Sequence, residues 1–311
     1  MRVIRSTSQS KTGQAGCVLT IGNFDAIHLG HQAMLERTRA IADHLSLPLV
    51  LMTFDPTPEE YFRGDAASPR VNNFSSRFFA LRKAGVDVML CMPFDAELAQ
   101  TDAGDFVDSI VVRNLNAKAL FVGDDFRFGK NRLGDFNLLK EYADQGAFSV
   151  ESLDTVTFRD ERISSSRVRA ALSDGDLDLA RSLLGRSFSI SGRVTRGQQL
   201  GRQWGFPTLN IPMRRKPVMT GVFAVSVRGV VDDAVTGVAN LGNRPTVDGF
   251  KTVLEVHLFD FNEDIYGKRV CVDFVSRIRG ERKFDDFDAL KKQIKKDAER
   301  ARELLLEADY A

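Results

Sequence analysis

Two histidines three residues apart stand where a strand is expected to give way to a helix. Residues 17–21 form a short apolar run typical of a buried strand, and the apolar residues of 32–41 recur at helical spacing. The turn between them, residues 22–31 (GNFDAIHLGH), carries His28 and His31 on one face of the first helical turn. Backbone N–H groups at a helix start are unpaired and lie at the positive end of the helix dipole. The segment therefore predicts a site for the phosphates of a nucleotide.

Two simpler explanations of the histidine pair remain open. The chain has only four histidines, and both members of the pair could be ordinary surface residues. A zinc site is the second alternative, although neither a cysteine nor a third histidine stands nearby at a ligand spacing.

Residues 22–31 resemble the GNFDGVHxGH signature of prokaryotic bifunctional riboflavin kinase/FAD synthetases, which belong to the HxGH nucleotidyltransferases. Three further segments are similar to motifs of this family in the same order: residues 53–58 (TFDPTP), 123–129 (GDDFRFG) and 163–169 (ISSSRVR). The chain departs from the family pattern at Ala26, where glycine is usual, and at Thr57, where histidine is usual. Alanine costs more than glycine in a turn that needs positive φ. The resemblance thus predicts a slightly altered turn with an intact site.

The resemblance implies that the first domain transfers an adenylyl group from ATP to FMN. His28 and His31 would donate hydrogen bonds to the phosphates, and Arg169 would hold the departing pyrophosphate with its planar guanidinium. The remaining motif positions are expected to bind the substrates: ATP at Gly22, Asn23, Phe24, Gly30, Ser164 and Ser165, and flavin at Phe54, Pro56, Pro58, Asp125, Arg127 and Phe128.

Two of these positions have purely structural alternatives. Ser164 precedes a predicted helix and could serve only as its cap. One of the two phenylalanines in residues 126–128 could belong to the core rather than cover a flavin ring.

A second candidate site lies in residues 192–210 (GRVTRGQQLGRQWGFPTLN), which resemble the riboflavin-kinase domain and its PTxN motif. Neither a Walker loop nor the protein-kinase motifs occur in the chain. Gly192, Gly197 and Gly201 would let backbone N–H groups approach the phosphates of ATP. Thr208 and Asn210 share a face of an extended segment, and their oxygens suit Mg²⁺.

Glu255 is the candidate base of this second site. In residues 252–259 the alternation places Leu254 and Val256 on one face of a strand, and Glu255 and His257 on the other. Taken alone, a strand glutamate is more often a solvated surface residue. The resemblance implies instead that Glu255 takes the proton from the ribityl hydroxyl of riboflavin.

The elements that must position these residues change character along the chain. Up to residue 145, short apolar strands alternate with helices, which is typical of a doubly wound parallel sheet. The expected strands are 48–54, 86–93 and 119–123, and the expected helices are 77–84, 103–115 and 136–145. Ligands of such sheets bind beyond the carboxyl ends of strands. His28, Phe54 and Asp125 all stand at such positions.

The second half begins with two predicted helices, 164–172 and 177–184, and then turns to short strands separated by glycine and proline. Strands at 188–194, 221–228, 234–241, 254–261 and 269–278 predict a small antiparallel barrel. A final helix, 287–308, has an apolar stripe and a lysine-rich solvent face. The prediction is an α/β doubly wound, Rossmann-like HxGH nucleotidyltransferase domain (residues 1–184) followed by an all-β six-stranded barrel kinase domain (185–311) with a C-terminal helix.

Composition limits the partners. The chain of 311 residues is 43% hydrophobic and carries 43 basic against 42 acidic side chains, so no overall field attracts nucleic acid or an anionic membrane. Its three cysteines are far apart, which favours reduced thiols, and no secretory signal or apolar run long enough to cross a bilayer is visible. We expect a cytoplasmic enzyme whose partners are small molecules: riboflavin, FMN, FAD, ATP and Mg²⁺. The sequence is compatible with an oligomer but does not specify one.

Two other functions are weighed against this one. An adenylyltransferase for a different phosphate acceptor would carry a degenerate kinase domain, and a flavin-binding module would lack catalysis. Both are disfavoured because the residues that the two reactions need are present: His28, His31, Arg169, Pro207, Thr208, Asn210 and Glu255.

Overall fold

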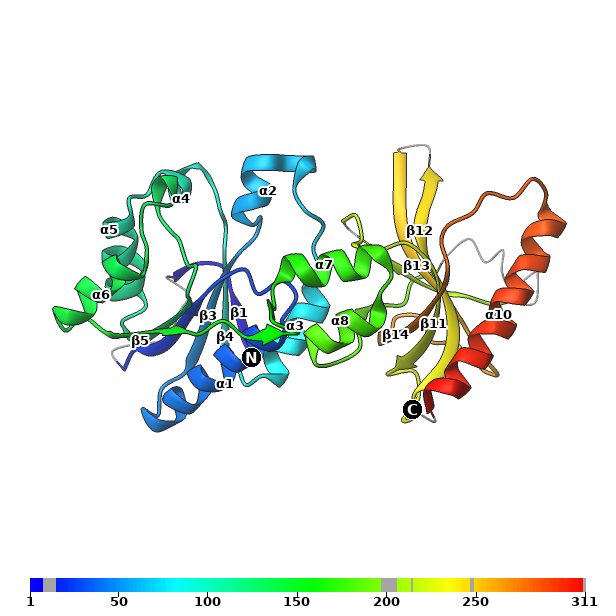
Figure 1. Ribbon diagram of the computed structural model, residues 1–311, viewed down its shortest axis with the longest axis horizontal. Helices are drawn as coiled ribbons and strands as arrows, with labels where there is room; N and C mark the ends of the chain where they lie inside the picture. The colour runs from blue at the N-terminus through cyan, green and yellow to red at the C-terminus, as the bar shows by residue number, and fades with distance from the viewer. Residues whose placement is uncertain (8–14, 197–205, 214, 247–248, 310–311) are drawn as a thin grey trace. The chain divides into compact units, whose positions relative to one another are not determined.

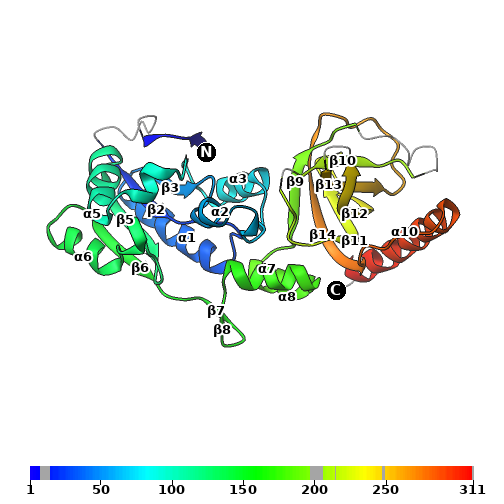
Figure 2. The same cartoon turned by 90° about the horizontal axis from the view of Figure 1, so that it is seen from above.

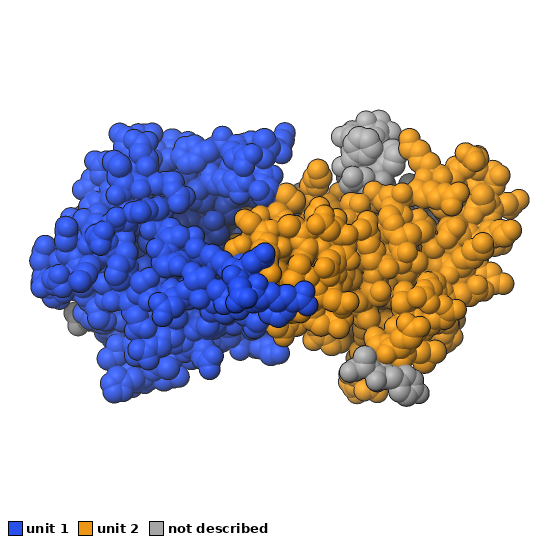
Figure 3. All heavy atoms as spheres, in the orientation of Figure 1, with its two compact units in different colours: residues 1–68, 78–163 blue, residues 69–77, 164–311 orange. Residues whose placement is uncertain are grey.

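The computed structural model describes residues 1–7, 15–196, 206–213, 215–246 and 249–309. Within these residues the chain forms two compact units, which Figure 3 colours separately. Unit 1 comprises residues 1–68 and 78–163, and unit 2 comprises residues 69–77 and 164–311. This division falls before the two helices that the sequence analysis groups with the first domain. The functional boundary at residues 184 and 185 stays a prediction.

A six-stranded parallel sheet forms the centre of unit 1 (Figures 1 and 2), in the order β1-β4-β3-β2-β5-β6. Strand β2 buries all five of its residues, as a strand covered on both faces should. The strands are β1 (Arg2–Ile4), β2 (Cys17–Ile21), β3 (Leu49–Phe54), β4 (Val88–Met92), β5 (Ala117–Gly123) and β6 (Ser149–Leu153). The hairpin strands β7 (Thr157–Phe158) and β8 (Glu161–Arg162) pair separately.

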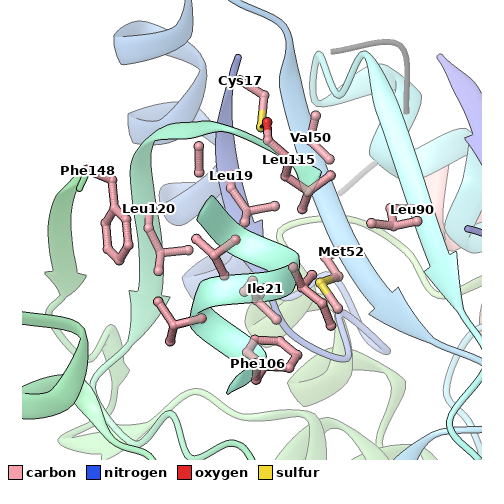
Figure 4. Close-up of a cluster of buried hydrophobic side chains, with 14 of the residues drawn as sticks. Cys17, Leu19, Ile21, Val50, Met52, Leu90, Phe106, Leu115, Leu120 and Phe148 are labelled. Carbon is pink, nitrogen blue, oxygen red and sulfur yellow. Dashed lines mark hydrogen bonds between the residues drawn. The ribbon is translucent and has the colours of Figure 1, made fainter. Parts of the chain in front are cut away.

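Helices cover both faces of this sheet. One buried cluster joins Leu19 and Ile21 of β2 to Phe106 and to the helical segment that follows it (Figure 4). The other joins Val18 of β2 to helices α1 and α3. The helices are α1 (Leu29–His44), α2 (Pro58–Arg63), α3 (Phe74–Lys83), α4 (Ala96–Gln100), α5 (Ala103–Phe106) with its π-helical continuation Val107–Asn114, and α6 (Phe136–Asp144). The predicted doubly wound class is confirmed.

The topology fixes where a ligand site can lie in unit 1. The chain builds β2, β3 and β4 outward in one direction and then returns to add β5 on the other side of β2. The direction of strand addition thus switches between β2 and β5. Open α/β sheets bind ligands in the crevice outside the carboxyl ends of the strands at such a switch point. The segments that leave these two ends are residues 22–28 and 124–128.

Unit 2 begins with two helices and continues as a six-stranded antiparallel sheet. Helix α7 (Ser165–Asp174) ends at Gly175, which adopts the left-handed conformation with φ 81°, and α8 (Leu177–Leu184) follows. The sheet order is β10-β13-β12-β11-β14-β9. Its strands are β9 (Ser189–Arg193), β10 (Leu209–Pro212), β11 (Gly221–Arg228), β12 (Val235–Thr246), β13 (Gly249–Leu258) and β14 (Arg269–Arg279).

The sheet curls into a nearly closed barrel, as the sequence predicts. The two edge strands approach each other because Thr195, just after β9, pairs with Asn210 of β10. The Thr195 backbone N–H donates to the Asn210 carbonyl oxygen at 2.8 Å. Closure removes exposed edges that would otherwise pair with other chains.

Gly192 makes this closure possible. A Cβ atom at this position would lie 2.3 Å from Cγ2 of Ile211 on β10, so any larger side chain pushes the two edges apart. We expect Gly192→Ala to lower the free energy of unfolding by about 1–3 kcal/mol, measured by urea denaturation. Gly280→Ala is the matched control, because its Cβ would meet nothing closer than 3.7 Å. Equal stability of the two variants would contradict the closure argument.

The C-terminal helix α10 (Phe287–Asp309) packs its apolar stripe on the barrel. Ala298, Ala301 and Leu305 join a buried cluster with Val222 and Val238. Asp297, 4% exposed, receives a bidentate ion pair from Arg279 at the end of β14, with distances of 2.7–3.1 Å. The Arg279 guanidinium joins the last helix to the barrel.

Candidate active sites

The turn that leaves β2 has an unusual backbone. Phe24 and Ile27 both have positive φ, at 44° and 51°, although a β-branched residue such as isoleucine strongly disfavours this region. Ala26 is fully buried and does not share this conformation. The replacement of the usual glycine by Ala26 therefore carries no penalty from positive φ.

Two side chains hold the strained turn in place. The Thr53 hydroxyl, at the end of β3, donates to the carbonyl oxygen of Asn23 at 3.2 Å. The Gln32 amide, in the first turn of α1, donates to the carbonyl oxygen of Ile27 at 2.9 Å. Strained residues persist where their surroundings over-determine them, which is common at ligand sites. Neither Thr53 nor Gln32 was singled out as a turn anchor from the sequence, because their role depends on the backbone path of the turn.

His28 is the N-cap residue of α1. Its Nδ1 accepts a hydrogen bond from the backbone N–H of His31 at 3.3 Å. A ring nitrogen that accepts carries no proton, so the neutral ring holds its proton on Nε2. The capping bond thus leaves His28 with one N–H donor, on the side of the ring away from the helix backbone. This is the donor that a phosphate oxygen requires.

The His28 ring stacks on the His31 ring, with centroids 3.8 Å apart. Phe24, 1% exposed, also packs against His31, with ring centroids 4.7 Å apart. Within the described residues, Nδ1 of His31 is buried and has no hydrogen-bond partner. Buried polar atoms of native proteins usually bind a protein group, a water or a ligand, so this nitrogen can accept a partner from outside the chain. The histidine pair is therefore not an ordinary surface pair, the first of the two simpler explanations.

The pKa of His31 is lowered well below its ordinary value of 6.5 because the imidazole is buried, and the neighbouring His28 adds to this effect. In the unfolded chain this ring takes up a proton below pH 6.5, whereas the folded chain resists protonation. We therefore expect the free energy of unfolding to fall as the pH drops below 6.5. Urea denaturation at several pH values measures this. His31→Leu should weaken the dependence of the unfolding free energy on pH, whereas His44→Leu, at an exposed position, should leave it unchanged. Identical pH profiles for wild type and His31→Leu would contradict this prediction.

The segment after β5 carries three of the predicted flavin-binding residues. Asp125 is exposed and lies 3.1 Å from Arg162 of β8, which also binds Asp124 at 2.9 Å. Arg127 is exposed, and its guanidinium contacts Asp135 at 2.7 Å. Asp125 and Arg127 are thus accessible at the switch point.

Phe128, the third, is only 7% exposed and belongs to the core cluster of unit 1. Its ring lies 5.3 Å from Phe126 in a stacked arrangement and 5.5 Å from Phe106. Phe126 is the less buried of the stacked pair. A flavin contact by Phe128 stays a prediction, and its packing supports a structural role.

The loop after β3 holds the other three predicted flavin-binding residues. Phe54 is half-buried, Pro56 is exposed and Pro58 opens helix α2. Thr57, where the family usually has histidine, is the N-cap of α2 and forms a capping box with Glu60. The Thr57 hydroxyl therefore stabilises the start of helix α2.

An aromatic cluster that the sequence analysis did not predict adjoins this loop. Phe94, after β4, lies within 5.8 Å of Phe54, Tyr61 and Phe62, all in edge-to-face contact. Phe62 is 68% exposed and Tyr61 40% exposed. These rings meet because β3 and β4 are neighbours in the sheet, which no motif in the sequence indicates. An exposed group of rings beside the switch point can accept a flat heterocycle.

Ser165 and Arg169 lie on α7 and Ser164 is its N-cap, all within unit 2. The Ser164 hydroxyl oxygen accepts from the Arg167 backbone N–H at 3.2 Å, so Ser164 does cap the helix. Ser165 is the first residue of α7 and is half-buried. Arg169 donates through Nε to the carbonyl oxygen of Pro69 at 2.8 Å. Their action together with the two histidines of unit 1 is a proposal.

The second candidate site lies on the barrel. Glu255 on β13 is paired with Asn210 on β10 and with Asn240 on β12. Paired residues of antiparallel strands project to the same face, so the three side chains form a polar row. Leu254 and Val256 are fully buried on the opposite face, while Glu255 is half-buried. The predicted alternation of this strand is confirmed.

A cavity of about 220 Å³ opens beside Thr208 and Asn210. Its wall combines apolar residues such as Val256, Leu258 and Tyr266 with polar ones. It is smaller than the roughly 300–1,000 Å³ of whole-ligand pockets, so it suits one ring system of a larger molecule. Glu255 is not among its lining residues.

The structure is compatible with a cation held by Thr208 and Asn210. The Asn210 side-chain amide donates through Nδ2 to the Thr208 carbonyl oxygen at 3.4 Å, which turns its Oδ1 the other way. A hydroxyl and an amide oxygen are ligands that Mg²⁺ accepts when phosphates complete its shell. In the described part of the chain, no three His, Cys, Asp or Glu side chains converge as a metal cluster. No arrangement there supports the zinc alternative.

Of the three glycines predicted to bind phosphates, only one can be placed. Gly197 and Gly201 lie outside the described residues. Gly192 is needed for barrel closure, as shown above, and its contact with ATP stays a prediction. No helix in the described ranges is both long and apolar enough to cross a membrane.

A doubly wound unit with a polar switch point and a six-stranded barrel with its own cavity define a two-domain protein, and each domain matches a known enzyme family. Residues 10–167 match the family model of FAD synthetase, and residues 184–305 match that of riboflavin kinase. The bifunctional riboflavin kinase/FMN adenylyltransferase of Haemophilus influenzae is 44% identical over 97% of this chain and 98% of its own length. The Escherichia coli K12 protein of the same name is 45% identical over 97% of both chains.

The chain belongs to the bifunctional riboflavin kinase/FMN adenylyltransferase family. A solved structure described as a macrolide-efflux protein from Streptococcus pneumoniae shares the fold over 97% of this chain and 99% of its own, with 31% identity and a TM-score of 0.78. The resemblance seen in the sequence motifs is confirmed at the level of the family and of both domains.

Proposed function

We propose that this chain carries out two consecutive reactions on one vitamin. The barrel domain transfers the γ-phosphoryl group of ATP to riboflavin, which gives FMN and ADP. The doubly wound domain joins FMN and the adenylyl group of a second ATP, which gives FAD and pyrophosphate. The observation that carries this proposal is that one chain holds both family models and matches bifunctional relatives over 97% of its length.

In the adenylyl transfer, a phosphate oxygen of FMN attacks the α-phosphorus of ATP and the bond to the pyrophosphate oxygen breaks. Such a step needs alignment and neutralisation of charge more than covalent help. Because Nδ1 of His28 accepts the capping bond, Nε2 is the ring nitrogen that would donate to a phosphate oxygen. The unpartnered His31 Nδ1 supplies a second polar atom. Gly30 lies between the two histidines in the chain, and Asn23 stands in the turn before them. Arg169 on α7 would bind the departing pyrophosphate through the guanidinium nitrogens beyond Nε.

Flavin binding in this domain is assigned to the loops after β3 and β5. Phe54, Pro56 and Pro58 would form one wall, which the exposed rings of Tyr61 and Phe62 extend. Asp125 and Arg127 are exposed on the neighbouring segment and offer polar contacts.

In the phosphoryl transfer, Glu255 takes the proton from the ribityl hydroxyl as its oxygen attacks the γ-phosphorus, and ADP leaves. A general base of this kind contributes about 10²–10⁴-fold to a rate. Thr208 and Asn210 would hold Mg²⁺, which neutralises charge on the phosphates. The adjoining cavity is a candidate for the adenine ring. The functional boundary near residue 184 and a cytoplasmic location belong to the same proposal.

Chromatographic separation of the flavins tests the function. The purified protein is incubated with riboflavin and Mg²⁺-ATP, and in parallel with FMN and Mg²⁺-ATP. We expect FMN and then FAD in the first mixture and FAD in the second. FAD formed only from supplied FMN would indicate an adenylyltransferase with a degenerate kinase domain, and unchanged flavin in both mixtures would indicate a binding module.

A further inference from the structure

One histidine outside both catalytic assignments organises the chain next to the barrel cavity. His257 lies on β13, and its Nδ1 is 2.9 Å from the carbonyl oxygen of Pro207. A carbonyl oxygen only accepts hydrogen bonds, so Nδ1 of His257 must carry a proton. Pro207 has no backbone N–H and directly precedes Thr208. The bond therefore fixes the backbone at the residue before the proposed Mg²⁺ ligands.

Two aromatic rings fix the orientation of the His257 imidazole. Phe206 lies 5.3 Å from it and Phe259 lies 5.9 Å from it, each with an interplanar angle of 77°. Edge-to-face contacts of this kind favour one ring orientation over others. The imidazole is thus held in the plane that reaches the Pro207 carbonyl.

The C-terminal helix α10 packs against Phe259, one of the two rings that orient His257. Phe259 is 5% exposed and packs in the cluster that contains Ala298 and Ala301 of α10. The guanidinium of Arg302 lies 4.2 Å from the centre of the Phe259 ring and also forms a bidentate ion pair with Asp260, at 2.8 and 3.1 Å. A continuous set of contacts runs from α10 through Phe259 and His257 to Pro207.

We propose that His257 is a positioning residue of the kinase reaction: by binding the Pro207 carbonyl, it sets the backbone that presents Thr208 and Asn210 to the Mg²⁺-bound phosphates of ATP. This inference rests on the proposed function of the barrel. His257 acts through the backbone and has no contact with the reacting atoms. Losing it should weaken the capture of Mg²⁺-ATP and leave the chemical step nearly unchanged.

His257→Leu removes the donor, and His257→Gln keeps an N–H that can reach a carbonyl oxygen. A hydrogen bond of this type accounts for about a 3- to 10-fold effect on an equilibrium. We expect His257→Leu to raise the KM for Mg²⁺-ATP in FMN formation by roughly that factor, with kcat and the KM for riboflavin unchanged within about 2-fold. His257→Gln should restore the KM for Mg²⁺-ATP. His44→Leu, the same change at an exposed histidine, should behave as wild type.

A binding measurement gives a readout that does not depend on turnover. Calorimetric titration with ADP, with and without Mg²⁺, reports how much the cation strengthens nucleotide binding. This gain should shrink in His257→Leu and return in His257→Gln. FAD formation from supplied FMN, the reaction of the other domain, shows that each variant is folded. If His257→Leu also loses FAD formation, His257→Gln decides the question. A wild-type KM for Mg²⁺-ATP in His257→Gln supports the proposal, and a raised KM in His257→Gln opposes it.

The outcomes separate this inference from the function on which it rests. If the wild type makes no FMN from riboflavin, the kinase assignment itself fails. If the wild type makes FMN but His257→Leu has an unchanged KM and an unchanged gain from Mg²⁺, only the positioning role fails. A large fall in kcat that glutamine does not rescue would show that His257 acts directly on substrate, which also overturns the proposal.

Discussion

His28→Ala should stop FAD formation at FMN. The substitution removes the Nε2–H group that we propose donates to a phosphate oxygen. Loss of one such donor to developing charge typically costs about 10²–10³-fold in kcat. With riboflavin and Mg²⁺-ATP as substrates, we expect FMN to accumulate at the wild-type rate while FAD falls by that factor. Chromatography of the reaction mixture over time measures both flavins.

A second variant separates catalysis from helix capping. His28 is also the N-cap of α1, and losing a cap costs about 1 kcal/mol of stability. His28→Asn keeps a good capping acceptor and lacks the ring donor. If FAD formation is lost in His28→Ala and restored in His28→Asn, the residue acts as a cap and the catalytic assignment is wrong. Loss in both variants supports the assignment.

Glu255→Gln should stop FMN formation and leave FAD synthesis from supplied FMN intact. Glutamine has the same shape as glutamate but cannot accept the ribityl proton. We expect FMN formation to fall by about 10²–10⁴-fold, the usual contribution of a general base. The phosphorylation rate is followed by the appearance of FMN, and the second activity by the conversion of added FMN to FAD.

The control is an exposed glutamate of the same unit that is distant in sequence from the residues that line the cavity. Glu307→Gln on α10 is such a position and should leave both activities unchanged. A Glu255→Gln variant that phosphorylates riboflavin at the wild-type rate would show that Glu255 is not the base of this reaction.

Much of the fold could be predicted from apolar patterning. Strand β11 has the bounds expected for residues 221–228, and the final helix ends within a residue of its predicted limit. Strand β6 was missed because Ser149–Leu153 lies at the sheet edge and mixes polar with apolar residues. Helix α2 was missed although Thr57 and Glu60 form a capping box that can be read in the sequence.

The arrangement of the site residues was harder to predict from the sequence than the fold. Motifs indicated His28, His31 and Glu255, but the stacking of the two imidazoles and the orphaned nitrogen of His31 depend on tertiary packing. The aromatic group around Phe94 unites segments that are separated in the chain and meet only because β3 and β4 are adjacent. The bond from His257 to Pro207 likewise spans 50 positions.

Mixing the two disabled variants tests most directly whether one chain holds two independent active centres. His28→Ala and Glu255→Gln are combined with riboflavin and Mg²⁺-ATP, and FAD is measured. Neither variant alone should make FAD from riboflavin, whereas the mixture should, because FMN released by the first is a substrate of the second. A mixture of folded variants that yields no FAD would contradict the account.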